Sequence, residues 1–228
     1  MKTIYLIRHS ESEHNKSTMH IIGGHLDDSP LTQHGEMQSY ALGERLASEG
    51  IKFDRIYSST YKRAMKTADI VSERLGYDIA KIIRRKELIE YGHGDFAGRL
   101  RSEVYTPELK RHLDNNSWKY VPPGGESQAM VAKRMYSVID DEILGKQVGE
   151  DNENREYKEN FSEVDESIGI FTHGTAIRCL LRKIMWFDPR HIYRMDIKNT
   201  SITELMHDAD GWHVNRINDY AHLNNMTR

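Results

Sequence analysis

The chain has 228 residues, of which 38% are hydrophobic and 29% are charged, a balance typical of a globular protein and too apolar for general disorder. The formal net charge of −3 gives no overall attraction for nucleic acid or for an anionic membrane, so we expect neither partner. Cys179 is the only cysteine, which excludes an intrachain disulfide and a cysteine-based zinc cluster. The apolar run before Arg8 is too short for a signal peptide and no stretch approaches 18 apolar residues, so we expect a cytoplasmic protein.

A strand and then a helix are predicted at the start of the chain. Residues 3–7 are β-branched, aromatic or otherwise apolar, which predicts a buried strand with Arg8 and His9 at its carboxyl end. Thr32 is placed to cap a helix that runs to about Ser48. The expected apolar stripe of that helix consists of Met37, Ala41, Leu42 and Leu46.

The alternation of strand and helix repeats along the chain. Residues 53–57 predict a second strand, residues 58–60 a bridge and residues 61–75 a second helix. Residues 167–171 predict a third core strand, followed by a helix over about residues 176–185. A short apolar piece at 79–83 and a closing hairpin from 201–206 and 212–217 complete the expected elements.

Two segments interrupt the alternation. Residues 90–126 are rich in Gly, Pro and polar side chains, which predicts an irregular excursion that we interpret as a cap over a site. Residues 150–166 contain eight acidic residues against Arg155 and Lys158, which predicts a solvated loop. Between them, a helix that follows Ser127 is expected to bury Val131, Met135, Val138, Ile139 and Ile143.

Together these elements predict one domain of residues 1–228 in the α/β class. We expect a three-layer sandwich with a mainly parallel central sheet, helices on both faces, and an inserted cap over the carboxyl ends of the strands. In such sheets ligands bind outside the carboxyl ends of the strands, where both His9 and His173 fall.

Residues 6–15, Leu-Ile-Arg-His-Ser-Glu-Ser-Glu-His-Asn, closely resemble the opening signature of the histidine phosphatase superfamily, which includes the cofactor-dependent phosphoglycerate mutases. Further segments are similar to motifs of that family and occur in the family's order, so that the resemblance spans about residues 3–205. These segments are residues 30–35, residues 57–68, Glu90 with residues 94–98, residues 124–127 and residues 172–174.

The residues in these motifs suit phosphoryl transfer, in which negative charge spreads over three oxygens and catalysis depends on positioning and positive charge. The imidazole of His9 is largely neutral near pH 7 and attacks phosphorus without a separate base, so His9 is the expected nucleophile. Arg8 and Arg63 offer planar, charged donors for two-point contacts with phosphate oxygens, and His173 completes the cradle. Without this pattern Arg63 reads as a surface residue in the first turn of a helix.

By resemblance, Asn15 and Gly174 also belong to the phosphate pocket, and Glu90 occupies the position of the family's acid. Its expected role is to protonate the leaving oxygen and then to help activate water. A loop carboxylate is easily misaligned by a few residues, so Glu87 and Asp95 remain candidates for the same role.

Other features leave their interpretation open. Ser10 stands where the family most often has glycine or alanine, and it either leaves the surroundings of His9 unchanged or alters their hydrogen bonds. Tyr91, Phe96 and Tyr105 either line the substrate pocket or pack the cap. The spacing of the histidine-rich cluster fits no recognised ligand motif, so we expect no metal and no other cofactor; its members are His9, His14, His20 and His25, near Asp27 and Asp28.

The sequence therefore predicts a metal-independent phosphatase that acts on a small phosphorylated metabolite through a phosphohistidine on His9. The segment Gly94–Gly98 resembles the phosphatase pattern more than that of the mutases. A cofactor-dependent phosphoglycerate mutase is the first alternative, and a phospho-ligand binding protein that has kept the fold without the activity is the second.

Overall fold

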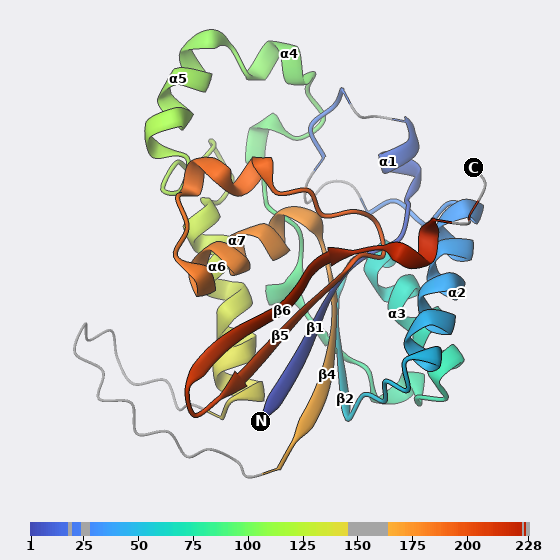
Figure 1. Ribbon diagram of the computed structural model, residues 1–228. Coiled ribbons are helices and arrows are strands. Elements are labelled where there is room, and N and C mark those ends of the chain that lie inside the picture. Colours follow the sequence, from blue (N-terminus) through green and yellow to red (C-terminus); the bar gives the residue numbers. More distant parts are fainter. Residues whose placement is uncertain (18–19, 24–27, 146–163, 225, 227–228) are drawn as a thin grey trace.

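The computed structural model describes residues 1–17, 20–23, 28–145, 164–224 and 226, and in the described chain one sheet of six strands forms the centre of the molecule (Figure 1). The strands lie in the order β3–β2–β4–β1–β5–β6, and the first four are parallel while β5 and β6 are antiparallel. Their bounds are Lys2–Arg8 (β1), Arg55–Ser59 (β2), Ile83–Arg85 (β3), Glu166–Thr172 (β4), Ile202–Asp208 (β5) and Gly211–Asp219 (β6).

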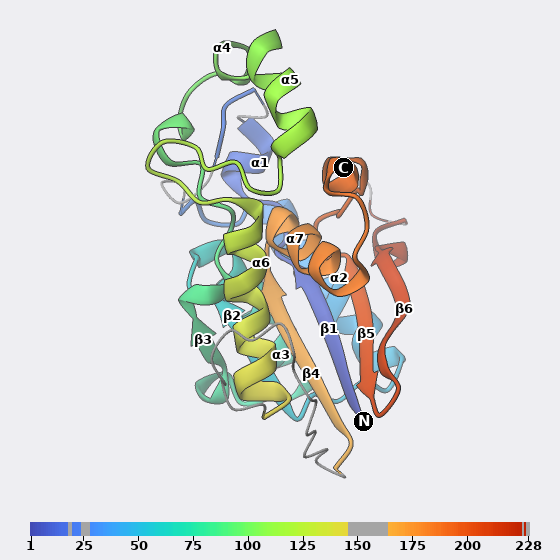
Figure 2. The same ribbon diagram turned by 90° about the vertical axis from the view of Figure 1, so that its left-hand side faces the viewer.

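Helices cover both faces of this sheet, which confirms the expected three-layer α/β architecture (Figure 2). The α-helices are Glu13–Ser17 (α1), Gln33–Ser48 (α2), Lys62–Leu75 (α3), Arg101–Val104 (α4), Pro107–Asn116 (α5), Gln128–Ser137 (α6) and Gly174–Met185 (α7). Short 3₁₀ segments are Ile79–Lys81 (η1), Lys86–Leu88 (η2), Gly94–Phe96 (η3), Pro189–Arg194 (η5) and Ala221–Leu223 (η6), and Val138–Ile143 (η4) continues α6 as a π-helix.

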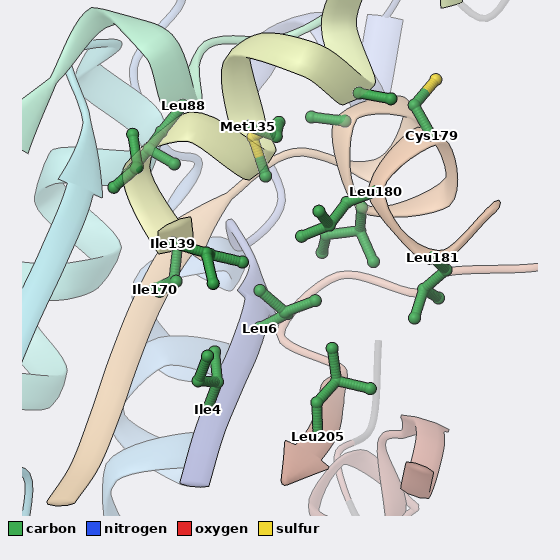
Figure 3. Packing of buried hydrophobic residues seen from close by; sticks show 14 of the residues in the cluster. Ile4, Leu6, Leu88, Met135, Ile139, Ile170, Cys179, Leu180, Leu181 and Leu205 are labelled. Atoms are coloured by element: carbon green, nitrogen blue, oxygen red, sulfur yellow. The ribbon is translucent and has the colours of Figure 1, made fainter. Parts of the chain in front are cut away.

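The core has two halves because successive residues of a strand point to opposite faces of the sheet. On β1, Ile4 and Leu6 pack with residues of α6 and α7, as Figure 3 shows, whereas Tyr5 and Ile7 pack with residues of α2 and α3. Burial of each such aliphatic side chain contributes about 1.5–3 kcal/mol. All five apolar residues expected on the helix after Ser127 are buried.

The predicted stripe of α2 is wrong at one residue. Thr32 caps the helix as expected, since its hydroxyl accepts a hydrogen bond from the amide of Gly35 at 2.9 Å. Leu42 and Leu46 are fully buried, but Met37 is 52% exposed. The buried face is turned so that Gln38 and Ser39 occupy it instead, because they bind the loop that follows His9.

The second strand begins two residues later than predicted and includes the buried Ser58 and Ser59. Phe53, expected inside it, precedes it and packs edge-on against Tyr5 at 5.4 Å between ring centroids. Buried serines are tolerated in a strand when their hydroxyls are paired. Here Ser58 donates to the carbonyl of Ser59, and the Ser59 hydroxyl lies 2.8 Å from Nε2 of His173.

The cap is more regular than predicted, because it contains α4 and α5 above the carboxyl ends of the strands (Figure 1). Helix α5 carries the signals of a helix start: the Thr106 hydroxyl accepts from the amide of Leu109 at 3.3 Å, and Pro107 is its first residue. In the described part of the chain, no helix is long and apolar enough to cross a membrane.

The expected acidic loop falls mostly outside the described residues, and its predicted end is wrong. Glu166 is the first residue of β4 rather than part of a loop. Its carboxylate lies 2.7 Å from Nζ of Lys2 and 2.5 Å from Nη2 of Arg55, so strand pairing and two ion pairs fix this end.

Candidate active site

The register of two central strands brings the two predicted histidines together. Arg8, the last residue of β1, pairs with Thr172, the last residue of β4, so that His9 and His173 follow directly on neighbouring strands. The amide of His9 donates to the carbonyl of Thr172 at 2.9 Å, and the two imidazole centroids lie 5.1 Å apart. The carboxyl ends of the strands are therefore where the side chains of the motifs meet.

Hydrogen bonds fix the protonation and direction of the His9 ring. Nδ1 lies 2.7 Å from the carbonyl oxygen of Ser10, which can only accept, so Nδ1 carries the ring proton. Nε2 keeps its lone pair and accepts a 3.2 Å hydrogen bond from Nε of Arg63. Burial, together with the charges of Arg63 and Arg8, lowers the pKa of His9 well below 6.5. His9 is therefore a neutral imidazole whose unprotonated nitrogen faces a guanidinium group.

Arg63 belongs to this centre and is not a surface residue. It lies in the first turn of α3 and is 4% exposed. Its guanidinium lies 5.0 Å from the centroid of the Tyr61 ring, which in turn meets the His173 ring edge to face at 5.3 Å. Burial raises the pKa of Tyr61 to about 12, so its hydroxyl stays neutral beside the cation.

Two buried nitrogen atoms of the site have no hydrogen-bond partner among the described residues: Nε of Arg8 and Nδ1 of His173. Nη1 of Arg8 donates to the carbonyl of Ile197 at 2.6 Å, and burial lowers the pKa of Arg8 to about 10 against the opposing charge of Glu90. Burial and the charge of Arg63 lower the pKa of His173 well below 6.5. An unpaired buried polar group costs about 1–3 kcal/mol, so both atoms favour a ligand that bonds them.

Glu90 lies at the amino-terminal end of α7. Its Oε1 accepts hydrogen bonds from the amides of Tyr91 at 2.8 Å and Ala176 at 3.0 Å, and its Oε2 accepts one from Thr175 at 3.2 Å. A carboxylate at this position is favoured by the free amides and by the helix dipole. The predicted acid is thus held by the same helix that begins beside His173.

The backbone that carries Glu90 is held by a half-buried ion pair. Arg134 on α6 donates to the carbonyls of Glu87 at 2.6 Å, Ile89 at 2.7 Å and Glu90 at 3.0 Å. The same guanidinium binds both carboxylate oxygens of Glu126, at 3.0 and 2.7 Å. Sequence reasoning missed Arg134, because it reads as one more polar residue on an amphipathic helix.

The two rival acids lie elsewhere. The charge of Glu87 acts on Arg85 at the edge of the sheet. Asp95 is exposed, and its carboxylate lies close to Gly124. In contrast, the charge of Glu90 acts on Arg8, which makes Glu90 the carboxylate that the fold brings to the centre.

Asn15 is connected to the centre by Asn199, a residue that the sequence analysis did not single out. Oδ1 of Asn15 accepts from the Ser12 hydroxyl at 3.2 Å and lies 3.5 Å from Nδ2 of Asn199. Asn199 also donates to the carbonyl of His9 at 2.8 Å. It precedes Thr200, which has a positive φ of 55°. In the sequence the two residues suggest only a turn before a strand.

Ser10 points away from the imidazole. Its hydroxyl lies 2.5 Å from that of Ser39 on α2, which donates to the carbonyl of Gly35 at 3.1 Å. Gly35 lies so close to the loop after His9 that a Cβ atom there would be 2.0 Å from the carbonyl oxygen of Glu11. The motif at residues 30–35 therefore supports the His9 loop by close backbone packing.

The remaining predicted residues have defined places. Gly174 is the first residue of α7, and a Cβ atom on it would meet Nε of Arg8 at 3.4 Å. Tyr91, Phe96 and Tyr105 all line one cavity under the cap. Among the described residues no group of three or more His, Cys, Asp or Glu side chains could hold a metal, and His25 and Asp27 lie outside them.

Comparison with known proteins places this geometry in a family. The family model of the histidine phosphatase superfamily (branch 1) matches residues 4–220. The chain is 28% identical over 196 residues to a 2,3-bisphosphoglycerate-dependent phosphoglycerate mutase of Parvibaculum lavamentivorans, covering 85% of each chain. Among solved structures it resembles YhfR of Bacillus stearothermophilus, with a TM-score of 0.77, 26% identity and coverage of 98% of this chain and 100% of that one.

A mycobacterial glucosyl-3-phosphoglycerate phosphatase solved with VO₃ has the same fold, with a TM-score of 0.75, 21% identity and coverage of 96% and 99%. The match to the family model extends over almost the whole chain and includes every residue assembled at the carboxyl ends of β1, β2 and β4. The chain is an enzyme of the histidine phosphatase superfamily, branch 1.

Proposed function

We propose that this enzyme hydrolyses the phosphate monoester of a small metabolite through a phosphohistidine on His9. The observation that carries the proposal is the state of His9: Nδ1 is tied to a backbone carbonyl, and the neutral Nε2 faces Arg63. A lone pair held in a cationic pocket is what an in-line attack on phosphorus requires.

In the first step Nε2 of His9 attacks phosphorus, the N–P bond forms and the bond from phosphorus to the ester oxygen breaks. The arriving phosphate competes for the guanidinium of Arg63, which frees the lone pair of His9. Nε of Arg8 and Nδ1 of His173, the two unpartnered atoms, are the proposed additional contacts of this group. Asn15 and the first turn of α7 at Gly174 complete the proposed phosphate pocket.

Glu90 supplies the proton that the leaving oxygen needs. Its Oε1 accepts two shorter amide hydrogen bonds, so we assign the proton transfer to Oε2, which accepts the longer one from Thr175. In the second step water attacks phosphorus, gives a proton to Glu90 and breaks the N–P bond, which releases phosphate and restores His9. Two inversions leave net retention at phosphorus.

A phosphoglycerate mutase is the second candidate, because the similar curated proteins of Parvibaculum and Brucella bear that name. The similar solved structures include a phosphatase. A mutase must shield the phosphohistidine from water and return the phosphoryl group to a second acceptor, whereas a phosphatase admits water. Both use the same centre, so the fate of the phosphohistidine separates them.

The test combines three measurements on one preparation. p-Nitrophenyl phosphate turnover is followed with and without EDTA, and 3-phosphoglycerate is assayed for isomerisation. Rapid quench and peptide mass analysis then locate the acid-labile, alkali-stable phosphoryl group. Turnover that survives EDTA with label on His9 supports the proposal, and efficient isomerisation supports the mutase. Silence in every assay favours a binding protein, and label on a serine refutes the mechanism.

A further inference from the structure

The cap encloses a cavity of about 620 Å³ whose purpose the proposed chemistry does not explain. This volume lies within the range of about 300–1,000 Å³ of ligand sites. The wall is formed by α4, α5, η5 and the first residue of α6, and it contains five aromatic residues: Tyr91, Phe96, Tyr105, Tyr120 and Tyr193. Aromatic faces of this kind hold flat rings by stacking.

One buried acceptor in the wall lacks a partner. Gln128 is 3% exposed, and its side chain is close enough to the Tyr193 hydroxyl to influence its pKa. Its Oε1 has no hydrogen-bond partner among the described residues, although an amide oxygen can accept two hydrogen bonds. The Ser117 hydroxyl in the same wall is also buried and unpartnered within the described chain. A ligand with an N–H or O–H group satisfies these atoms.

The charge of the wall is opposite to that of the whole chain. Four basic side chains line the cavity, Arg101, Lys110, Arg190 and Arg194, against the single acid Asp114. The chain as a whole carries a formal charge of −3. Arg190 also pairs with Asp188, but the lining still holds more basic than acidic side chains, which favours a ligand with negative charge beyond the reacting phosphate.

The cavity begins at the residue that follows the proposed acid. The amide of Tyr91 donates to Oε1 of Glu90 at 2.8 Å, while the Tyr91 ring lines the cavity. Tyr193, which lines the same cavity, is close enough for the charge of Glu90 to act on its hydroxyl. A leaving group that takes its proton from Glu90 thus departs beside this wall.

We propose that the cavity receives the leaving group of the phosphate ester, and that this group is a planar ring that carries N–H or O–H donors and further negative charge. This inference rests on the proposed function. A three-carbon leaving group such as glycerate offers no ring to the tyrosines and no ring donor to Gln128. Ring-bearing phosphates, a class that includes mononucleotides, are therefore preferred over phosphoglycerate.

The experiment measures kcat/KM for glycerol 3-phosphate, adenosine 5′-monophosphate and adenosine 3′,5′-bisphosphate. Wild type is expected to favour the monophosphate over glycerol 3-phosphate by at least about tenfold, and the bisphosphate further. Gln128→Leu keeps the volume and removes the acceptor, so it lowers kcat/KM for both nucleotides about tenfold and leaves glycerol 3-phosphate unchanged. Arg194→Gln lowers only the added preference for the bisphosphate.

The matched control is Gln33→Leu, which changes an exposed glutamine that is likewise the first residue of its helix, α2. If Gln128→Leu does not fold, Tyr105→Leu removes a ring from the wall and is expected to show the same selectivity. Equal hydrolysis of glycerol 3-phosphate and the nucleotides by wild type, or equal losses on every substrate in the variants, overturns the proposal.

Failure of the proposed function gives a result that can be distinguished from failure of the cavity proposal. If no ester is hydrolysed, p-nitrophenyl phosphate included, the function is wrong, and calorimetry with adenosine then tests the cavity without any phosphoryl group. Adenosine binding that is lost in Gln128→Leu supports a ring site, whereas the absence of binding to wild type overturns it.

Discussion

The reaction centre and the cap are built on different principles. At the centre, strand register fixes buried side chains: His9, Arg63 and His173 are each at most 4% exposed and contact one another. The cap is a set of short helices around a cavity lined by flat rings and exposed cations. A centre of this kind tolerates little change because its side chains are buried against one another, whereas a cap can alter its wall without altering the centre. If the proposed cavity is the leaving-group site, the choice of substrate is expected to depend on the cap.

The strongest test of this division is removal of the nucleophile. His9→Ala is expected to lower kcat by at least about 10³-fold on every substrate, because no neighbouring group replaces Nε2. Thermal melting checks that the fold persists. His213→Ala, on β6 and 44% exposed, is the control and keeps full turnover. Residual activity above a few per cent in folded His9→Ala contradicts the assignment.

Glu90 is expected to matter in proportion to the basicity of the leaving group. An alkoxide needs a proton, so Glu90→Gln lowers the rate on alkyl phosphates by about 10²–10⁴-fold, while p-nitrophenyl phosphate is affected far less. The two rates are measured side by side over a range of pH. Glu87→Gln and Asp95→Asn serve as controls with near wild-type rates, and equal losses on both substrates point to a structural role for Glu90.

Arg134 links the two regions, since it holds the backbone of Glu90 from helix α6. Arg134→Lys cannot bind the Glu126 carboxylate at two points, so we expect about a tenfold loss on alkyl phosphates with p-nitrophenyl phosphate nearly unaffected. The pH profile is expected to change with the position of the acid. Arg111→Lys, 71% exposed on α5, is the control. A uniform loss on both substrates indicates that Arg134 only stabilises the fold.

The centre could be predicted from the sequence because its residues lie in contiguous motifs that follow strands. Arg8-His9 and Thr172-His173 come together by parallel pairing alone, which periodicity predicts. Arg134 and Asn199 could not be predicted, because each acts through contacts with residues more than 40 positions away in the chain. Helix α5 was missed although Thr106 and Pro107 mark its start, since Gly and Pro around it dominate the composition. Cytoplasmic location and the absence of nucleic-acid and membrane partners stay predictions.

Buried neutral histidines make the centre, unlike the cap, sensitive to acid. Burial lowers the pKa of His9 and His173, and that of His222, which bonds Thr200 near the centre, falls to about 4. The unfolded chain therefore binds more protons below pH 6.5, so stability decreases as the pH falls from 6.5 towards these folded values. Between pH 7 and pH 5 the free energy of unfolding is therefore expected to decrease by about 2 kcal/mol less in His222→Ala than in wild type. Urea unfolding at both pH values measures it.

The control for that measurement is Gln33→Ala, which removes an exposed side chain that carries no ionisable group and is expected to leave the pH dependence unchanged. An unchanged pH dependence in His222→Ala would show that folding does not lower the pKa of His222, contrary to the burial argument.

The smallest expected effect concerns Ser10, which adjoins His9 yet belongs to the packing of α2. Ser39 donates to the carbonyl of Gly35, so in the 2.5 Å contact between the two hydroxyls Ser10 is the donor. Ser10→Ala therefore leaves no buried donor unpaired and is expected to cost about 1 kcal/mol of stability, with kcat changed by less than about twofold.

Ser39→Ala is the informative counterpart, because it deprives the buried Ser10 hydroxyl of its acceptor. We expect it to destabilise the protein by about 1–3 kcal/mol, more than Ser10→Ala, although Ser39 is the farther residue from the imidazole. Chemical unfolding of both variants gives the order, and kcat on p-nitrophenyl phosphate reports on His9. A large loss of kcat in Ser10→Ala, or a smaller destabilisation in Ser39→Ala, would place the Ser10 hydroxyl in the reaction centre and reverse the distinction between the chemistry and its packing.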